Sequence, residues 1–468
     1  MDTIALLAHN MPTAVIAYRA GVPVTAQQFL SDARRLAESL PPGEHVLNVC
    51  ADRYRFTVGL AACLIAGRVS LLPSTHTPEV IGQLAGFAPD AFCLTDDAHC
   101  DIKLPQHYYS EDALSAQDPS GRGDDAGRLD TDLADGADWS VPQIPATQLA
   151  AIVFTSGSTG TPLPYRKTWG RLARCVRDGA PRLGLLDGRS HTLIGTVPAQ
   201  HMYGFESTVL LALVSGNALC AERPFYPADI AAAMAAVPRP RALITTPVHL
   251  RALLASAVEL PAVDLIVSAT APLDQNLARE VEVKFDTLLL EIYGSTETGQ
   301  IAMRRAAQSA AWRLWPGVRL KVADGQVFAH GGHVEQWTPM CDVIELLDDE
   351  EFLLHGRTAD LVNVAGKRSS FGYLNAQLNA IPGVVDGVFF LRESTTGSTG
   401  VTRLGAVVVA PTLSVAALTE QLRRRIDPVF LPRPLIMVER LPRNATGKLP
   451  QQALQSLAST HLQTNESP

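Results

Sequence analysis

The sequence predicts an α/β protein with a large, multi-sheet N-terminal domain covered by flanking helices, followed by a small, mobile α+β C-terminal domain. Three observations support this. Apolar runs of strand length alternate with helical periodicity, which is typical of parallel sheets covered by helices. After about residue 311 the pattern changes to β-hairpins. A boundary near Arg357 then leaves enough chain for a small domain. We therefore expect domains at residues 1–356 and 357–468.

The first elements follow one another in this rhythm. Thr25–Leu40 has a threonine cap and apolar residues at helical spacing, and His45–Ala51 has the composition of a buried strand. The next helix is expected over Arg55–Gly67, with its final glycine as the C-cap. Val69–Pro73 is then a strand, and Pro78–Thr95 is another helix–strand unit.

An acidic, glycine-rich segment over residues 115–138 interrupts the rhythm, and we expect an exposed loop there. Strands resume at Leu149–Thr155 and in three later segments, which are Arg239–Thr246, Ala262–Thr270 and Thr287–Gly299. Two hairpins follow, with turns at Ala323–Gly325 and Asp348–Glu351. The final segment, Ser459–Pro468, is expected to be frayed.

Composition limits the class of protein. Of 468 residues, 47% are hydrophobic and 18% charged, as in folded proteins, and the formal charge of -8 argues against a broad nucleic-acid surface. Seven cysteines, an odd number without a CxxC pair, favour reduced thiols, and Cys63 is expected to be buried. The N-terminus lacks a basic leader, and the longest apolar stretch, Val58–Gly67, is too short to span a bilayer. We expect a cytoplasmic location.

A loop rich in hydroxyl groups and glycine follows the strand that ends at Phe154. Glycine lets the backbone approach a ligand, and exposed amides with Ser and Thr hydroxyls bind anions. The loop is not a Walker A motif, because no GxxxxGK[ST] pattern occurs there. A plain Ser/Gly connector is the alternative. The residues concerned are Thr155, Ser156, Gly157, Ser158, Thr159 and Gly160.

The order T-S-G-S-T-G-x-P resembles the phosphate-binding motif of the adenylate-forming superfamily, which includes acyl- and aryl-CoA synthetases, peptide-synthetase adenylation domains and luciferases. Five further segments resemble motifs of that superfamily in the expected order. They are Pro198–Glu206, Ser268–Leu273, Tyr293–Gly299, Cys341–Arg357, and the pair formed by "AGKR" at 365–368 with "LPRNATGK" at 441–448. The chain is identified by these motifs as a member of the superfamily.

The resemblance implies a two-step reaction that uses ATP and Mg²⁺: a carboxylate attacks the α-phosphate, and a thiol then displaces AMP. Lys448 is the catalytic lysine, Glu297 the magnesium ligand, and His201 lies beside the acid and the thiol tunnel. Besides Thr155 to Gly160, nucleotide contacts are expected from Lys167, Thr270, Ala271, Pro272, Tyr293, Gly294, Thr296, Asp342 and Arg357. Tyr293 would offer a ring face to adenine, and Asp342 and Arg357 would bind the ribose.

The acid and the thiol acceptor have their own expected residues. The acid would contact His201, Tyr203, Gly204, Phe205, Ser268 and Gly294, although a core stripe is the alternative for residues 202–205. The thiol acceptor would contact Gly366, Lys367 and Arg368.

Two positions depart from the superfamily's pattern. Leu163 stands where a phosphate-loop lysine is usual, so Arg166 or Lys167 is expected to supply the missing charge. Ala359, followed by Asp360, stands at the usual hinge position. A weaker departure is Asn363, where lysine is frequent.

The bulky residues of the segment "HMYGFE" favour a small or flat acid. The short chain and "RKTW" resemble stand-alone ligases of bacterial aryl-polyene pigment pathways, which activate an acid such as 4-hydroxybenzoate for an acyl carrier protein or CoA. The alternatives are an amino-acid adenylation enzyme, with Glu206 as partner of the ammonium group, a medium-chain acyl-CoA synthetase, a luciferase-like oxygenase, and a non-catalytic ATP-binding module.

Overall fold

The computed structural model describes residues 2–73, 75–109, 139–155, 163–357, 361–364, 367–392, 403–443 and 449–464. The acidic segment predicted at 115–138 lies outside these ranges. The chain divides into two compact units. Unit 1 comprises Met1–Ile244, Ala257–Ile266 and Gly294–Ile301, and unit 2 comprises Thr245–Ser256, Val267–Tyr293 and Ala302–Pro468. The domain boundary expected near residue 357 stays a prediction.

A six-stranded sheet organises the first part of unit 1, in the order β10-β9-β5-β4-β6-β7. Its strands are β4 (His45–Asn48), β5 (Val69–Leu72), β6 (Phe92–Thr95), β7 (Gln106–Tyr108), β9 (Leu149–Thr155) and β10 (Leu163–Thr168). All neighbouring pairs are parallel except β9 and β10. The parallel sheet predicted from alternating strand and helix patterns is therefore confirmed.

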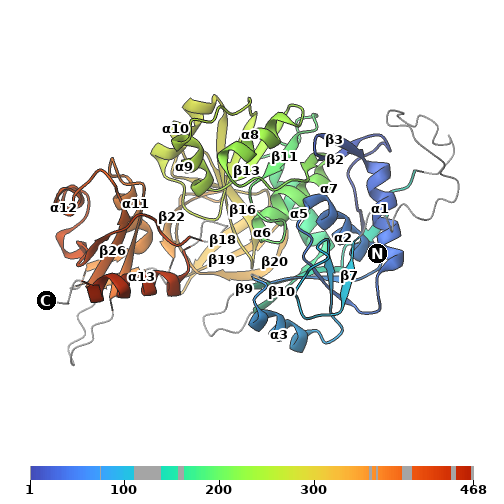
Figure 1. Cartoon of the computed structure of the whole chain (residues 1–468), viewed down its shortest axis with the longest axis horizontal. Helices are drawn as coiled ribbons and strands as arrows, with labels where there is room; N and C mark the ends of the chain where they lie inside the picture. Colours follow the sequence, from blue (N-terminus) through green and yellow to red (C-terminus); the bar gives the residue numbers. More distant parts are fainter. Residues whose placement is uncertain are drawn as a thin grey trace. The chain divides into compact units, whose positions relative to one another are not determined.

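Helices α1 (Ala26–Ser39), α2 (Arg53–Ile65) and α3 (Pro78–Phe87) follow the strands as predicted, and α1 packs beside α2 (Figure 1). Thr25 caps α1 by accepting a hydrogen bond from the backbone of Gln28, whose side chain in turn accepts from the backbone of Thr25. Gly67 has φ +69° just beyond α2, which is the left-handed conformation expected of a helix C-terminus.

Unit 1 also contains the strand run β13-β11-β12-β2-β3. These strands are β2 (Val15–Arg19), β3 (Val22–Thr25), β11 (Thr192–Gly195), β12 (Ala218–Cys220) and β13 (Arg241–Thr245), and β1 (Thr3–Ala5) pairs separately with β8 (Gln143–Pro145). The helices of this part are α5 (Trp169–Gly179), α6 (Met202–Gly204), the π-helix η1 (Phe205–Leu210), α7 (Leu211–Ser215) and α8 (Pro227–Ala235).

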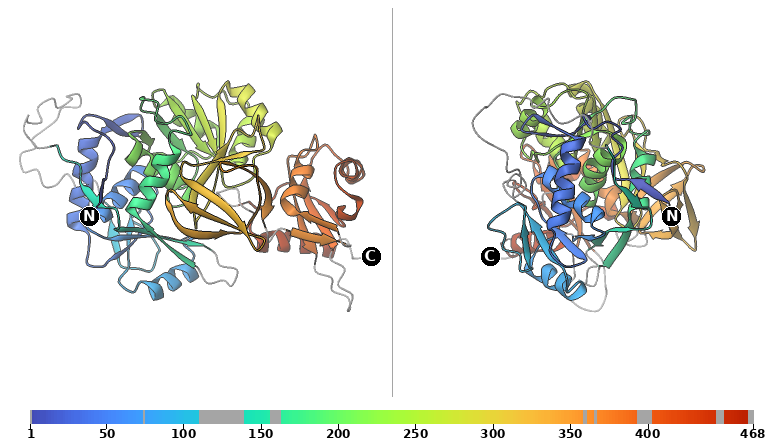
Figure 2. Two further views of the ribbon diagram at one scale, coloured as in Figure 1. Left: turned by 180° about the vertical axis from the view of Figure 1, so that it is seen from behind. Right: turned by 90° about the vertical axis from the view of Figure 1, so that its right-hand side faces the viewer.

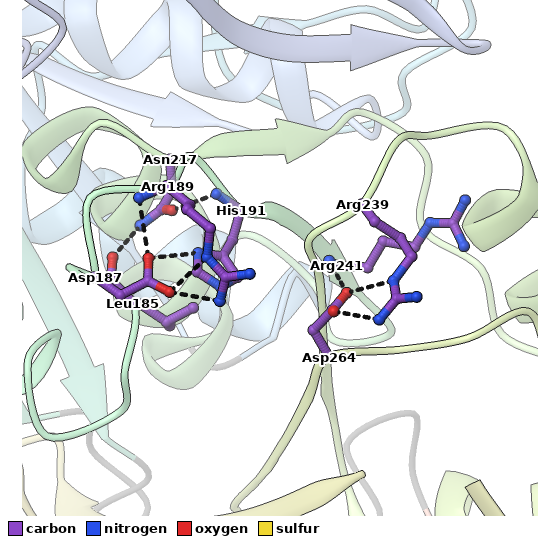
Figure 3. Close-up of polar contacts among 8 residues, drawn as sticks. All are labelled: Leu185, Asp187, Arg189, His191, Asn217, Arg239, Arg241 and Asp264. Carbon is purple, nitrogen blue, oxygen red and sulfur yellow. Dashed lines mark hydrogen bonds and ion pairs between the residues drawn. The ribbon is translucent and has the colours of Figure 1, made fainter. Parts of the chain in front are cut away.

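Polar contacts secure the amino-terminal ends of β11 and β13 (Figure 3). Asp264 accepts from two guanidinium nitrogens of Arg239, at 2.6 and 3.2 Å, and from the backbone N of Arg241 at 2.8 Å. Asn217 accepts from the backbone N of His191 and donates to the carbonyl of Leu185. In a parallel sheet the ligand-binding edge is the carboxyl end of the strands. We therefore assign the contacts at this opposite edge to stability.

Unit 2 contains α9 (Pro247–Ala255), α10 (Gln275–Phe285) and the antiparallel run β21-β22-β17-β16. The strands are β16 (Gly299–Arg304), β17 (Trp312–Leu314), β21 (Asp342–Leu346) and β22 (Glu351–Arg357). The chain passes between the units within β13, β14 (Leu265–Ser268), β15 (Leu288–Ser295) and β16. A three-stranded sheet consists of β18 (Val318–Ala323), β19 (Gln326–Gly331) and β20 (Val334–Met340).

Both predicted hairpins form. In β18–β19, Ala323 pairs with Gln326, and the two residues between them, Asp324 and Gly325, have φ values of +51° and +75°. Positive φ at both positions is the type I′ pattern, which suits the twist of paired strands. The other hairpin joins β21 to β22.

The C-terminal part of unit 2 is a small α+β assembly around the sheet β25-β26-β27. Its elements are β23 (Leu361–Val364), β24 (Lys367–Ser370), α11 (Phe371–Asn379), β25 (Asp386–Arg392), β26 (Arg403–Val409), α12 (Val415–Arg423), the 3-10 turn η3 (Pro428–Phe430), β27 (Leu435–Met437) and α13 (Gln451–Thr464). Alternate residues of β26 face opposite sides. Ala406 and Val408 pack with α11 and α12, whereas Val407 packs with α13. The helices and strands of this part are drawn in Figures 1 and 2.

The prediction of a frayed tail from Ser459 is wrong for residues 459–464, which continue α13. Leu454 and Ala458 are buried against the sheet one turn earlier, and the hydroxyl of Thr460 donates to the carbonyl of Ser456. The docked apolar face therefore extends the helix beyond the point at which the local sequence becomes polar.

Candidate active site

The strands around the predicted phosphate loop form an antiparallel hairpin in unit 1. Thr155 at the end of β9 is paired with Leu163 at the start of β10. Ser156 to Gly160 lie outside the described residues, so their predicted phosphate contacts stay predictions. Leu163 is 51% exposed, and its aliphatic side chain provides no charge for a phosphate.

Lys167 lies four residues further along β10. Its neighbour Arg166 is exposed, whereas the Lys167 side chain is 5% exposed, as the alternation of a strand requires. Its Nζ donates a hydrogen bond to the backbone carbonyl of Glu297 at 3.0 Å. Burial lowers the pKa of Lys167, and the nearby Glu206 carboxylate opposes that effect. The predicted contact of Lys167 with a phosphate stays a prediction, and its observed partner is the Glu297 backbone.

The turn that carries Glu297 is held by reciprocal hydrogen bonds between Ser295 and Thr298. The hydroxyl of each accepts from the backbone N of the other, at 3.2 and 3.3 Å. A Cβ on Gly294 would collide with the carbonyl oxygen of Gly299, so glycine is needed for this close approach. Thr296 and Glu297 are half-buried at the tip of the turn. The sequence YGSTETG thus forms a hydrogen-bonded turn that carries the carboxylate of Glu297.

The predicted acid-binding segment, residues 198–206, is compact and largely buried. Tyr203 and Phe205 are 6% and 0% exposed, and the Phe205 ring packs edge-on against Phe56 at 6.4 Å. A Cβ on Gly204 would collide with the carbonyl oxygen of Pro198. The Phe205 contact fits the core role that the sequence left open, and the predicted acid contacts of Tyr203 and Gly204 stay predictions.

His201 caps the short helix α6. Its Nδ1 accepts a hydrogen bond from the backbone N of Tyr203 at 3.3 Å. In a neutral imidazole with Nδ1 as acceptor, Nε2 carries the hydrogen. The cap therefore fixes the orientation of the His201 ring, and a neutral ring in this orientation would present Nε2–H as a donor.

Arg53 ties this segment to the rest of unit 1. Its side chain is 1% exposed, and its NH2 donates to the carbonyls of Gly195 and Val197 at 2.8 and 2.9 Å. Its NH1 donates to the hydroxyl of Thr208 at 2.6 Å. Burial lowers the pKa of Arg53 to about 10, so the guanidinium remains charged at neutral pH. The carboxyl end of β11 and the π-helix are thereby joined.

Unit 2 brings together the residues that the resemblance assigns to the nucleoside. The hydroxyl of Tyr293 donates to the carboxylate of Asp342 at 2.7 Å, and the Tyr293 ring contacts Trp312 and Phe352 with centroid distances of 5.5 and 5.6 Å. Asp342 is directly paired with Arg357 across β21 and β22. Three residues spread over 65 positions of the chain, 293 to 357, therefore meet at one place.

The loop at residues 268–273 is anchored by a buried ion pair. Glu291 accepts from the backbone N of Leu273 at 2.9 Å and from Nε of Arg304 at 2.6 Å, and Arg304 also donates to the Leu273 carbonyl at 3.3 Å. Within this loop Ser268 is fully buried. Thr270 has φ +77°, a left-handed conformation that is costly for a β-branched residue.

Thr270→Gly is expected to raise the free energy of unfolding by about 1 kcal/mol. Relief of about 1–2 kcal/mol of backbone strain outweighs the roughly 0.5–1 kcal/mol of extra chain entropy that glycine adds to the unfolded state. Urea unfolding of the purified protein measures the difference. Thr270→Val keeps the branched shape and the strain, and should show no gain. A glycine variant less stable than wild type would refute the assignment of strain.

Comparison with known proteins identifies the family. Residues 3–334 match the model of the AMP-binding enzyme family. A 4-coumarate–CoA ligase of Rhodobacter capsulatus is 32% identical over 277 residues, which are 59% of this chain and 67% of the ligase. The chain belongs to the AMP-binding enzyme family. It is therefore an adenylate-forming ligase, as the motifs predicted.

The solved structures agree on the fold of this family. ATP-bound MatB from Rhodopseudomonas palustris superimposes with a TM-score of 0.78 at 20% identity, over 96% of both chains. The o-succinylbenzoate CoA synthetase of Bacillus subtilis, solved with ATP and a magnesium ion, gives 0.76 at 18% identity, over 95% of this chain and 97% of the synthetase. The predicted α/β fold is confirmed, and the predicted ATP and Mg²⁺ are confirmed at the level of the family.

Several residues assigned from the family's motifs remain predictions. Lys448 and Gly366 lie outside the described residues. Lys367 and Arg368 open β24 and are described only through their backbones. Ala359 and Asp360 also lie outside the described residues. In the part of the chain that is described, no helix is long and apolar enough to cross a membrane.

Sequence reasoning missed two groups of residues in this AMP-binding enzyme. One is Arg53, which reads as an ordinary charge at a helix start. The other group consists of Cys175 and Gln300, together with Glu206 and Lys167, whose proximity the sequence did not indicate. Arg53 lies between Asp52 and Tyr54, and Lys167 lies between Arg166 and Thr168, so the neighbouring residues gave no signal that either charge is buried.

Proposed function

We propose that this enzyme uses ATP to adenylate a small aromatic acid of the hydroxybenzoate type. It then transfers the acyl group to the phosphopantetheine thiol of an acyl carrier protein or of CoA. The observation that carries the proposal is the Tyr293–Asp342 hydrogen bond of 2.7 Å together with the paired Asp342 and Arg357. An aromatic face beside a carboxylate that accepts from sugar hydroxyls suits an adenine nucleoside.

The residues present fit a magnesium ion bound mainly by substrate. Within the described ranges no group of three or more His, Cys, Asp or Glu side chains is placed to hold a metal by itself. Glu297 offers one hard oxygen ligand on a rigid turn. Mg²⁺ is commonly held by one or two carboxylates plus substrate phosphates, which matches this set. When bound, the ion neutralises charge on the phosphate oxygens.

In the first half-reaction an oxygen of the acid bonds to the α-phosphorus of ATP, and the bond from that phosphorus to the bridging oxygen of pyrophosphate breaks. The protein contributes positioning and charge stabilisation. Lys448 is assigned to the charge that develops on the α-phosphate and on the attacking carboxylate. Nε2–H of His201 is assigned to orient the acid by donating to its carboxylate.

In the second half-reaction the thiol loses its proton to solvent, and its sulfur bonds to the acyl carbon. The bond from that carbon to the AMP oxygen then breaks, which releases AMP. Lys367 and Arg368 at the start of β24 are assigned to the acceptor, because cationic side chains suit an acidic carrier protein or the phosphates of CoA.

Two observations support an aromatic acid. The relatives named for 4-coumarate and o-succinylbenzoate act on acids that carry an aromatic ring. In addition, Glu206 is 2% exposed, and burial raises its pKa to about 7, partly offset by Lys167. A carboxylate committed to buried protein partners is a poor partner for the ammonium group of an amino acid, which argues against the amino-acid alternative.

The test is pyrophosphate release from ATP with a panel of acids: 4-hydroxybenzoate, 4-coumarate, benzoate, octanoate and phenylalanine. We expect pyrophosphate release with the hydroxylated aromatic acids to exceed release with octanoate and phenylalanine by about tenfold or more. An acid that lacks one or two of the contacts made by the preferred acid is typically disfavoured by this factor. Preference for octanoate or phenylalanine would replace the proposed substrate class, and no release with any acid would favour a binding module.

The acceptor is identified in the same assay. Addition of CoA, or of a carrier protein that bears phosphopantetheine, should convert the enzyme-bound acyl-adenylate to a thioester, which mass spectrometry detects. If neither thiol is acylated while pyrophosphate is released, the transfer part of the proposal is wrong.

A further inference from the structure

We infer that Lys167 is a positioning residue: its buried ammonium group, compensated by Glu206, holds the Glu297 turn in place for magnesium-bound ATP. This inference rests on the proposed function, because it assigns a purpose to Glu297 as the metal ligand. Every residue involved belongs to unit 1.

The first step of the argument is the location of Lys167. Its strand, β10, begins at Leu163, which is paired with Thr155, the first residue of the predicted phosphate loop. From there the Lys167 side chain passes inward, and Nζ donates to the Glu297 carbonyl at 3.0 Å. Because that carbonyl and the Glu297 side chain share one Cα, fixing the carbonyl fixes the place and direction in which the Glu297 side chain leaves the backbone. The strand after the phosphate loop is thereby tied to the turn with the metal ligand.

The second step is the cost of burying this ammonium group. A lysine that is 5% exposed is rare unless its charge is compensated. Burial lowers the pKa of Lys167, and Glu206 is the largest influence in the opposite direction. A leucine or methionine would fill this position at no electrostatic cost. The retention of a lysine whose hydrogen bond reaches the Glu297 backbone therefore indicates a role in positioning.

The third step is the way in which Glu206 is itself held. Cys175 Sγ of α5 lies within hydrogen-bond distance of two acceptors that share its single S–H, Glu206 Oε1 at 3.4 Å and the Gln300 carbonyl at 3.5 Å. The side-chain amide of Gln300 donates to the Ser207 hydroxyl at 2.8 Å. Gln300 lies three residues after Glu297, and Glu206 and Ser207 belong to η1, which continues the acid-binding segment. The cluster therefore links the acid-binding segment, the metal turn and the strand after the phosphate loop.

The test separates positioning from stability by a double substitution. Lys167→Met removes the tether and leaves Glu206 buried without its countercharge, so both stability and ATP binding should fall. In Lys167→Met/Glu206→Gln no charge is left uncompensated, so thermal stability should recover towards that of wild type. The tether to Glu297 is still missing in the double variant. Its affinity for ATP in the presence of Mg²⁺ should therefore stay reduced.

The measurement is isothermal titration of the full-length protein with ATP, once with Mg²⁺ and once with EDTA. Loss of an outer contact that orients a metal ligand typically weakens metal binding about 10- to 100-fold. We therefore expect Kd for ATP with Mg²⁺ to rise about tenfold in both Lys167→Met and the double variant, and to differ little from wild type in EDTA. Lys167→Arg, which keeps a donor and the charge, should fall between wild type and Lys167→Met. The matched control is Lys103→Met, which removes an exposed lysine.

The outcomes separate this inference from the proposed function. If wild-type protein binds no ATP, the proposed function fails. If wild type binds ATP with Mg²⁺ and the double variant binds it equally well, Lys167 serves stability alone and the inference is overturned. An equal loss of affinity with Mg²⁺ and with EDTA would also overturn it, because the effect would then not involve the metal ligand.

Discussion

Lys448→Ala is expected to slow acyl-adenylate formation by about 10²- to 10³-fold, which is the usual effect of removing one group that stabilises transition-state charge. The resemblance assigns the Lys448 ammonium group to the charge shared by the α-phosphate and the attacking carboxylate, so its loss should lower kcat and change KM for ATP much less. Pyrophosphate release with the best acid of the panel measures the effect.

A second readout shows whether the effect is confined to the first half-reaction. Acyl-adenylate supplied to the variant should still be converted to thioester at close to the wild-type rate, because the α-phosphate has already reacted. The matched control, Lys103→Ala, removes an exposed lysine and should leave both rates unchanged. Adenylation by Lys448→Ala at the wild-type rate would remove the central assignment of the proposed mechanism.

Arg53→Met is expected to lower the free energy of unfolding by about 3–5 kcal/mol. It removes the donors to two buried carbonyls and a hydroxyl, and each buried group left without a donor costs about 1–3 kcal/mol. The groups affected are the carbonyls of Gly195 and Val197 and the hydroxyl of Thr208. This is a large share of the stability of an ordinary domain. Urea unfolding followed by circular dichroism gives the difference.

Arg55→Met is the control for this substitution, because Arg55 lies two residues along the same helix. It approaches Asp96 at 3.7 Å with a side chain that is 24% exposed. The Asp96 side chain is 6% exposed, but it keeps its hydrogen bonds from the backbone N of Ala51 and of Asp52 when Arg55 is removed. Arg55→Met should therefore cost less than Arg53→Met, about 1–2 kcal/mol. Equal stability losses in the two variants would show that the buried hydrogen bonds of Arg53 contribute no more to the free energy of unfolding than the Arg55 ion pair does.

Local rules predicted the regular elements well where one residue type decides the geometry. Thr25 marked the start of α1 because its hydroxyl accepts from the first turn, and Gly67 marked the end of α2 because glycine tolerates positive φ. The turn at Asp324 and Gly325 was predictable for the same reason. The end of α13 was not, since docking of Ala458 and not local propensity extends that helix.

The candidate site also contains features that the sequence predicts and features that it does not predict. The motif YGSTETG predicted a rigid turn because Gly294 alone permits the close approach to Gly299. The partner of Lys167 was not predictable. The alternation of exposed and buried residues along β10 showed only which face of the strand Lys167 occupies. Which carbonyl meets the ammonium group depends on a segment 130 residues away.

The sequence by itself determined the superfamily, the βα rhythm and the residues that carry the proposed chemistry, because motifs and local conformational preferences are properties of short segments. Tertiary structure alone decided that Arg53 bonds to residues on both sides of the predicted acid-binding segment and that Lys167 and Glu206 are buried together. It also decided that Tyr293 meets Asp342. The physical reason is that the energy of a buried charge depends on which groups surround it in space, and those groups come from distant parts of the chain.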